Sequence, residues 1–185
     1  MYRPGHTGVS LLVYAPLGYA LLIEGRVALS IVGGGLVVAL AMVPDLDMRV
    51  PGVSHRGSTH TLAFALCIGV LLGAGGWALA TALGEAGTAL GGAGTTLGEG
   101  VTVRVGGVSP IGLGGFAFAI GVLTICSHLL ADVITPMGIA PFWPLSGRRF
   151  SLGIAKSSNT FANALLLALG VCVTLGALWL AGSVG

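Results

Sequence analysis

One apolar stretch decides the fold class: residues 111–132 read IGLGGFAFAIGVLTICSHLLAD. Its apolar part, Ile111–Ala131, contains no Asp, Glu, Lys or Arg and is long enough for a membrane-spanning helix, which needs roughly 20 apolar residues. The stretch ends on His128 and Asp132, and an ionisable pair at such a place is unfavourable unless it faces a wet cavity or a partner. The same stretch therefore predicts both a membrane protein and a functional site.

Four further apolar runs accompany this stretch. Two of them, Thr61–Leu83 and Thr160–Ala181, are also long enough to span a bilayer. The first two runs, Gly8–Ile23 and Val27–Val43, are shorter, and a proline interrupts the first, so they favour a tight helical hairpin. None of the runs alternates in polarity as the strands of a membrane barrel do. We therefore predict an all-α integral membrane protein, a polytopic helical bundle of about five membrane segments in a single domain over residues 1–185.

The composition supports a membrane protein and excludes other classes. Of the 185 residues, 55% are hydrophobic and 8% are charged, whereas about 25% of a typical soluble domain is charged. The mean hydropathy is +0.99. A net charge of +2 gives no basis for binding nucleic acid, and the 33 glycines follow no fixed period, which excludes collagen. The expected surroundings are therefore membrane lipids.

The basic residues predict the orientation. If all five segments span, the N-terminus and the loops 44–60 and 132–159 share one side of the membrane, together with six of the eight basic residues. Only Arg26 and Arg104 lie on the other side, so the positive-inside rule predicts that the first side is cytoplasmic. The Gly/Thr-rich segment 84–107 is then an external linker. We expect a multi-pass protein of the cell membrane, inner or plasma, with a cytoplasmic N-terminus.

All the histidines and aspartates fall on the predicted cytoplasmic side, at or near the ends of apolar runs. They are His6, His55, His60, His128, Asp45, Asp47 and Asp132. Histidine and carboxylate side chains gathered at one mouth of a bundle are ligands that a divalent metal such as zinc binds well. The other side has no histidine or aspartate, and its only carboxylate side chains are glutamates. The sequence therefore predicts a metal site at the cytoplasmic mouth.

Spacing within two motifs supports a shared site. His128 and Asp132 are four residues apart, so they lie on one face of a helix and can ligate a single ion. Asp45 and Asp47 follow a proline in a turn, from which both can reach one ion or bridge two. Each motif also has a structural interpretation, because aspartate is common in turns and at helix ends.

The motif HRGSTH, residues 55–60, places an arginine between two histidines. Its serine or threonine is expected to cap the third helix, which places His60 in the first turn. Arg56 is unusual in a loop that only binds metal, but it fits a site that holds a substrate anion beside the metal. Arg148 and Arg149 are further candidates for binding the substrate, and the alternative for them is contact with anionic lipid.

Taken together, these motifs resemble the YdjM-like family of inner-membrane proteins, described as membrane-bound metal-dependent hydrolases, and its archaeal-type members in particular. The resemblance rests on His6, PDLD (44–47), HRGSTH (55–60) and SHLLADVITPMG (127–138), followed by Trp143-Pro144. Two positions depart from the family pattern. Met48 stands where members often carry a histidine, and no glutamate directly follows Asn159. These departures favour a site for one ion over a dinuclear site.

The predicted function is metal-dependent hydrolysis at the cytoplasmic membrane surface. The expected metal ligands are His60, His128 and Asp132, and either Asp45 or Asp47 is expected to complete or bridge the site. His6 and His55 are further ligands or proton carriers. Zinc is the first choice of metal and manganese the second. Asp45 or Asp47 is expected to take a proton from water, and Arg56 to hold the anionic part of the substrate.

The location of these residues also indicates the substrate. A site at the depth of the lipid head groups favours an amphiphilic phosphoester or ester. The alternative is a metal-binding protein that is not an enzyme: a transporter, a sensor or a scaffold for a partner. Transport is the weaker of these, because a conduit needs polar groups near the midplane and the middle of each run is almost entirely apolar.

Overall fold

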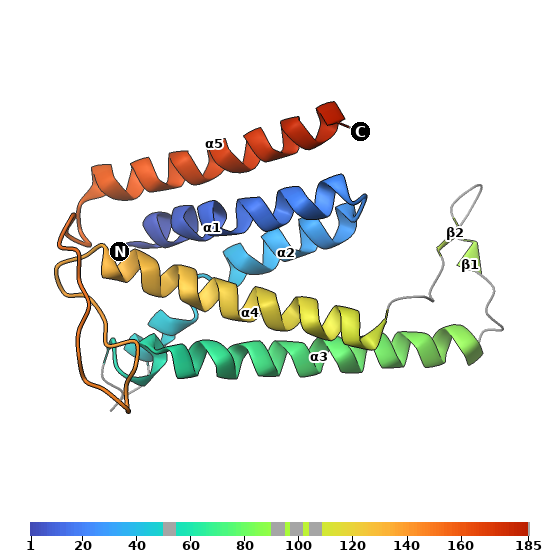
Figure 1. The fold of residues 1–185 in the computed structure, drawn as a ribbon, viewed down its shortest axis with the longest axis horizontal. Coiled ribbons are helices and arrows are strands. Elements are labelled where there is room, and N and C mark those ends of the chain that lie inside the picture. The colour runs from blue at the N-terminus through green and yellow to red at the C-terminus, as the bar shows by residue number, and fades with distance from the viewer. Residues whose placement is uncertain (50–54, 90–94, 97–101, 104–108, 185) are drawn as a thin grey trace.

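Five helices lie roughly side by side along the length of the molecule (Figure 1). This computed structural model describes residues 1–49, 55–89, 95–96, 102–103 and 109–184. The helices are α1 (Arg3–Ile23), α2 (Val27–Leu40), α3 (Leu62–Ala89), α4 (Pro110–Val133) and α5 (Thr160–Val184). Two 3-10 turns lie between α2 and α3, and two short strands pair between α3 and α4; they are η1 (Pro44–Arg49), η2 (Ser58–His60), β1 (Thr95–Thr96) and β2 (Thr102–Val103).

Within the described residues, five segments are long and apolar enough to cross a membrane. They are Arg3–Ile23, Val27–Arg49, Leu62–Glu85, Pro110–Val133 and Thr160–Ser183. This confirms the predicted fold class, a polytopic helical membrane protein. The second segment extends beyond α2 and includes η1. The 14 residues of α2 alone extend only about 21 Å, which is less than the ~30 Å hydrocarbon core of a bilayer.

The first helix is longer than predicted. It begins at Arg3, with a proline in its first turn, where the missing amide hydrogen leaves no bond unmade. His6 therefore lies inside α1 and not ahead of it. The helix also continues through Pro16, the proline that was expected to interrupt the first apolar run. Membrane helices tolerate an internal proline where neighbouring helices or side chains satisfy the freed backbone groups.

The start of α3 also corrects the sequence prediction. The Phe64 amide donates to the Thr61 hydroxyl at 3.1 Å, so Thr61 caps the helix and neither Ser58 nor Thr59 does. His60 therefore lies in η2, just before α3, and not in the first turn of the helix.

The linker predicted for residues 84–107 is described only in part. Its first residues, up to Ala89, continue α3 as a helix. β1 and β2 follow, paired antiparallel. The other residues of the linker, Arg104 among them, lie outside the described residues.

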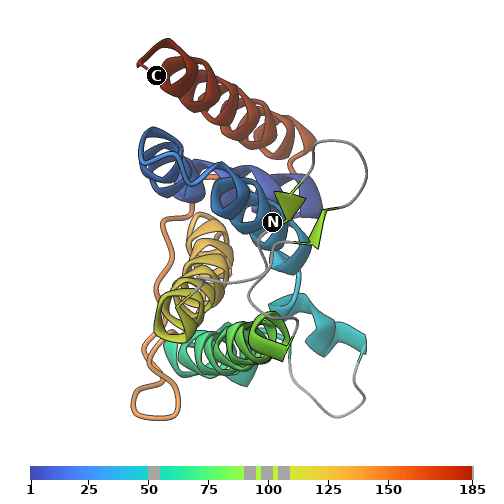
Figure 2. The same ribbon diagram turned by 90° about the vertical axis from the view of Figure 1, so that its right-hand side faces the viewer.

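The helices pack as two close pairs joined through α1. α3 packs on α4 and α5 packs on α1, while α1 also contacts α2 and α4 (Figure 2). Glycines permit the closest approach, since the backbone of Gly8 in α1 meets Leu166 and Gly170 in α5. A Cβ atom on Gly8 would overlap the carbonyl oxygen of Leu166.

Replacing Gly8 with leucine is expected to force α1 and α5 apart and to lower the free energy of unfolding by about 1–3 kcal/mol. Gly115→Leu in α4 is the matched control, because a Cβ at that position meets nothing within 4 Å. Thermal unfolding in detergent measures both variants. The close contact of α1 with α5 would be contradicted if Gly8→Leu unfolded at the same temperature as Gly115→Leu.

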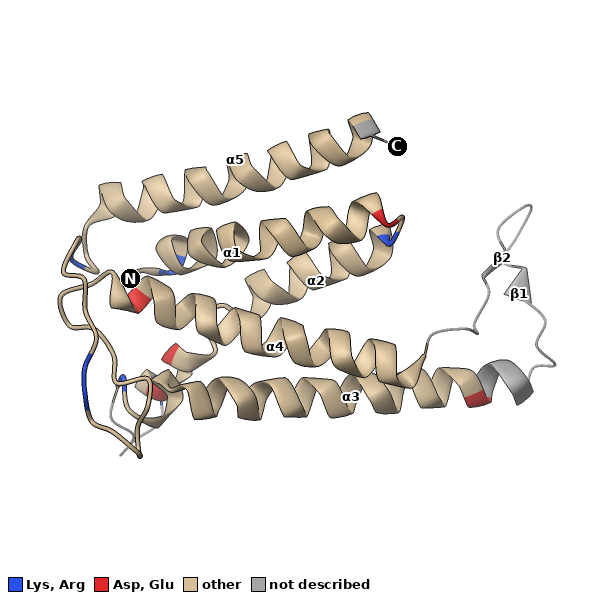
Figure 3. Ribbon diagram, viewed as in Figure 1, with Lys and Arg blue, Asp and Glu red and all other residues tan. Residues whose placement is uncertain are grey.

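Three parts of the chain meet at one end of the bundle: the N-terminus, the two turns η1 and η2, and segment 134–159 (Figure 1). Most Lys and Arg residues of the described chain lie at that end, while Arg26 pairs with Glu24 in the turn at the other end (Figure 3). Buried Ala65, Ile125 and Ile139 form a core that joins α3, α4 and segment 134–159 beside this end. The fold thus fixes the polar end of the molecule on packed helices.

Candidate metal centre

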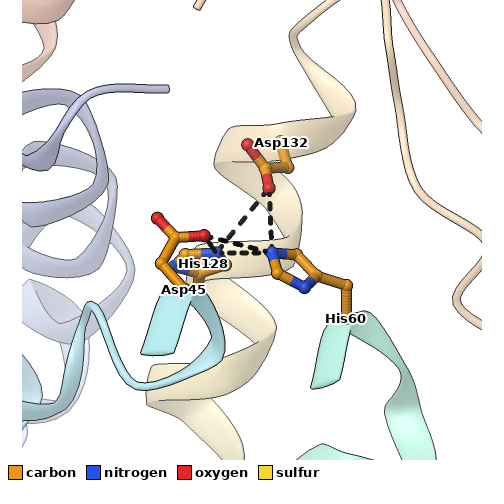
Figure 4. Close-up of side chains that lie close together, drawn as sticks. All are labelled: Asp45, His60, His128 and Asp132. Atoms are coloured by element: carbon orange, nitrogen blue, oxygen red, sulfur yellow. Dashed lines mark hydrogen bonds and ion pairs between the residues drawn. The ribbon is translucent and has the colours of Figure 1, made fainter. Parts of the chain in front are cut away.

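Four side chains from three elements point at one another at the polar end of the bundle (Figure 4). They are Asp45 of η1, His60 of η2, and His128 and Asp132 of α4. One ligand atom from each lies within 4.8 Å of the others. We call this group the four-residue cluster. Its histidines are fully buried, and its aspartates are no more than 8% exposed.

Short distances join the cluster atoms. The Nε2 atoms of His60 and His128 are 3.2 Å apart. Oδ1 of Asp45 lies 3.3 Å from the first of these nitrogens and 3.4 Å from the second. Oδ2 of Asp132 lies 3.4 and 3.6 Å from them, and it has no hydrogen-bond partner within the described part of the chain. Two ring nitrogens and two carboxylate oxygens thus surround one point.

The outer nitrogen of each ring is already occupied. Nδ1 of His128 lies 2.7 Å from the carbonyl oxygen of Ala41, which can only accept, so Nδ1 donates. The Thr59 hydroxyl donates its hydrogen to Asp47, so it must accept from Nδ1 of His60 at 3.0 Å. Each neutral ring therefore directs the lone pair of Nε2 into the cluster. Such outer hydrogen bonds orient histidines that bind metals.

The cluster favours a positive charge at its centre. Burial lowers the pKa of His60, but the carboxylates of Asp132 and Asp45 beside its ring outweigh burial and raise that pKa above its ordinary value. The two buried carboxylates are the cause, because they attract any cation placed between them. The same electrostatic demand is met by a divalent metal ion.

Asp132 is held by positive groups on its other oxygen. Its Oδ1 accepts from Nη2 of Arg56 at 2.9 Å and from the Met1 amine at 2.8 Å. The second arm of the Arg56 guanidinium, Nη1, donates to Oγ1 of Thr135 at 3.0 Å and to the carbonyl of Gly138 at 3.2 Å. The structure therefore directs Arg56 at Asp132, and its predicted contact with a substrate anion stays a prediction.

The backbone of Arg56 is also unusual. Its φ of 60° lies in the left-handed region, which residues other than glycine seldom adopt. The side chain is buried and tied at three acceptors, so the surrounding contacts hold this conformation in place.

His6 lies against the cluster without joining it by a hydrogen bond. Its ring stacks on His128, with centroids 3.9 Å apart and planes 5° apart. Its Nε2 lies 3.6 Å from Oδ1 of Asp132 and 3.9 Å from Oδ2 of Asp45. Both ring nitrogens are buried without a hydrogen-bond partner among the described residues. A buried polar group in that state is unfavourable, which indicates that water or an ion completes the site.

Asp47 and His55 form an outer layer. Nδ1 of His55 lies 3.0 Å from Oδ1 of Asp47, while Oδ2 of Asp47 accepts from Thr59 and from the Arg56 amide. Asp47 therefore orients the ring of His60 through Thr59, whereas Asp45 faces the cluster. Asp47, His55 and His60 also have ligand atoms within 4.8 Å of one another.

Arg148 and Arg149 lie on the exposed part of segment 134–159. Nη1 of Arg149 donates to the carbonyl of Met137 at 3.1 Å, and the Arg148 guanidinium lies 5.4 Å from the centroid of the Phe150 ring. These contacts do not bring them into the cluster. Their role in binding the substrate stays a prediction.

Sequence reasoning missed two groups that fix the histidines. In the sequence, Thr59 is marked as a partner of His60 only by standing next to it, and a threonine at this place also fits a helix cap. The carbonyl of Ala41 is a backbone group at the end of α2, where the last carbonyls of any helix lack partners within the helix. The unpaired carbonyls expected at a helix end are therefore a signal for such a contact, but the sequence does not say which histidine binds to the Ala41 carbonyl.

Comparisons with other proteins give the family and nothing closer. Neither the curated proteins nor the solved structures contain a match to this chain. A family model described as YdjM inner membrane protein matches residues 1–184, almost the whole length of the chain. The match confirms the resemblance read from the His, Asp and Pro motifs. The chain therefore belongs to the YdjM inner membrane protein family.

Proposed function

We propose that the protein is a membrane-embedded, metal-dependent hydrolase that binds one divalent ion in the four-residue cluster. The observation that carries the proposal is the arrangement of His60 and His128. Their outer nitrogens are occupied by hydrogen bonds, and their inner nitrogens face each other at 3.2 Å between Asp45 and Asp132. Without a cation, two lone pairs and two carboxylates would repel one another in a buried site.

The donor set favours zinc. Two imidazole nitrogens and two carboxylate oxygens are common zinc ligands. Manganese binds the same side chains but prefers a larger share of oxygen ligands. We propose one ion in this cluster because Oδ1 of Asp132 is already paired with the guanidinium of Arg56, which leaves only Oδ2 of Asp132 open to an ion.

The surrounding residues divide the remaining tasks. A divalent ion in the cluster supplies a Lewis acid that lowers the pKa of water bound to it. Nε2 of His6 faces both carboxylates without a hydrogen bond, so it is placed to accept a proton. Thr59 and Asp47 keep the ring of His60 in its orientation. His55, exposed and hydrogen-bonded to Asp47, is placed to exchange protons with the solvent.

The location of the cluster supports an amphiphilic substrate. The cluster residues lie at or just beyond the ends of segments that are able to span a membrane, close to the expected depth of the lipid head groups. The basic residues at this end favour the cytoplasmic face by the positive-inside rule. We therefore infer an ester or phosphoester of a lipid as the substrate class.

A hydrolysis assay tests the proposed function. Detergent-purified protein is stripped with a chelator, supplied with zinc or manganese, and mixed with vesicles of phosphatidylethanolamine and phosphatidylglycerol. Mass spectrometry then follows released fatty acid and water-soluble phosphate. We expect product only after metal is restored, and none from Asp45→Asn. Stoichiometric metal without any product would contradict the hydrolase and favour a metal-binding protein that is not an enzyme.

A further inference from the structure

A groove runs along the bundle between α1, α2 and α5. Its volume is about 480 Å³, within the range of about 300–1,000 Å³ that ligand pockets occupy. Small residues on all three helices line it. These include Ala15 and Gly18 of α1, Gly35 and Ala39 of α2, and Ala177 of α5. Because all three helices belong to candidate membrane spans, the groove lies among the segments expected to be surrounded by hydrocarbon.

The lining offers little to a polar ligand. The Tyr14 hydroxyl donates to the carbonyl of Ser30 at 2.6 Å, and the Ser30 hydroxyl donates to the carbonyl of Gly18 at 3.0 Å. The hydroxyl of Thr174 donates to the carbonyl of Gly170 at 2.8 Å. These three side chains use their hydrogens inside the protein, and apart from Tyr19 the rest of the lining is apolar or glycine, so the groove favours an apolar occupant.

The dimensions of the groove match one hydrocarbon chain. Along α1 the groove extends from Leu11 to Leu22, about 16 Å at 1.5 Å per residue, which is about half of a ~30 Å hydrocarbon core.

The groove begins close to the metal centre. Leu11 follows His6 by five residues, about 8 Å along α1. On α2, Ala39 lies two residues before Ala41, whose carbonyl binds His128. A chain lying in the groove therefore has one end near the four-residue cluster.

We propose that this groove holds the hydrocarbon chain of a membrane lipid and, resting on the proposed function, that this lipid is the substrate whose ester group reaches the cluster. The groove selects for a long chain, because only a long chain reaches past Leu11 from a head group at the cluster. The substrate class is thus a long-chain lipid ester or phosphoester.

Photolabelling tests the groove directly. The probe is phosphatidylglycerol with a diazirine near the end of its acyl chain, in vesicles that contain the full-length protein. Gly35→Leu adds a side chain to the lining of the groove at a position where a Cβ meets nothing within 4 Å. Gly75→Leu in α3 makes the same change where there is equally open space outside the groove. Unfolding temperatures verify that both variants fold.

We expect label on the groove residues of α1, α2 and α5, reduced about tenfold by Gly35→Leu and unchanged by Gly75→Leu. The proposal is overturned if the amount of label on these residues equals that on the outer face of α3 and is unchanged by Gly35→Leu. It is also overturned if label is absent and Gly35→Leu converts a dimer to a monomer, since a second copy then covers the groove.

Asp45→Asn separates this inference from the proposed function. Its groove is intact, so labelling should equal that of the wild-type protein. Groove labelling without any lipid hydrolysis by the wild type would leave the lipid site standing and remove the substrate role. Hydrolysis by the wild type without groove labelling would remove the lipid site and leave the hydrolase standing.

Discussion

Asp45→Asn is expected to lower metal affinity more than about 100-fold, so that the purified variant contains no metal. Replacing a direct ligand should cost more than replacing an outer hydrogen-bonding group, which typically costs 10–100-fold. Asparagine keeps the shape of the side chain but removes one of the two negative charges that face the Nε2 atoms of His60 and His128. Elemental mass spectrometry on detergent-purified protein measures the effect.

Asp45 is the best position for this test because its polar contacts lie inside the site. Its carboxylate faces His6, His60 and His128, whereas Asp132 also neutralises Arg56 and its loss would disturb folding. Two matched variants complete the set. Asp47→Asn should weaken binding about 10–100-fold, because Asp47 only orients the ligands.

Glu24→Gln should change nothing, since Glu24 is an exposed carboxylate at the other end of the bundle. Wild-type protein that stays free of metal after incubation with excess zinc and manganese would contradict the metal centre. Full metal content in Asp45→Asn would contradict the assigned ligand.

The fold was predictable because its signal is local. Five long apolar runs identify five helices without any knowledge of how the helices pack. Helix boundaries were less accurate, since they depend on single residues. The proline at position 4 extends α1 towards the N-terminus, and Thr61 starts α3 where Ser58 and Thr59 compete for the same cap.

The candidate site was predictable where the spacing between residues alone fixes the direction in which their side chains point. His128 and Asp132 share a helix face at four residues apart, and the structure places both in the cluster. Asp45 and Asp47 differ by two residues in a turn, so the sequence could not tell which one faces inward. The guanidinium of Arg56 reaches Asp132 from a distant part of the chain, and no local pattern encodes that contact.

Arg56→Met is expected to lower the free energy of unfolding of the metal-free protein by about 3–5 kcal/mol, the typical loss when one partner of a buried ion pair is removed. Methionine keeps much of the volume but leaves Asp132 with one positive neighbour fewer. It also removes the donor to Thr135 and Gly138. The loss should shrink when zinc is added, because an ion in the cluster supplies positive charge to the same carboxylate.

Thermal unfolding in detergent, with and without zinc, measures both parts of this expectation. Arg26→Met is the matched control, because Arg26 forms an exposed pair with Glu24 and its loss should change stability by less than about 0.5 kcal/mol. An unchanged unfolding temperature for Arg56→Met would show that the pair with Asp132 does not stabilise the fold. A loss that zinc leaves undiminished would show that the ion and the guanidinium do not act on a common carboxylate, which would remove Asp132 from the ligand set.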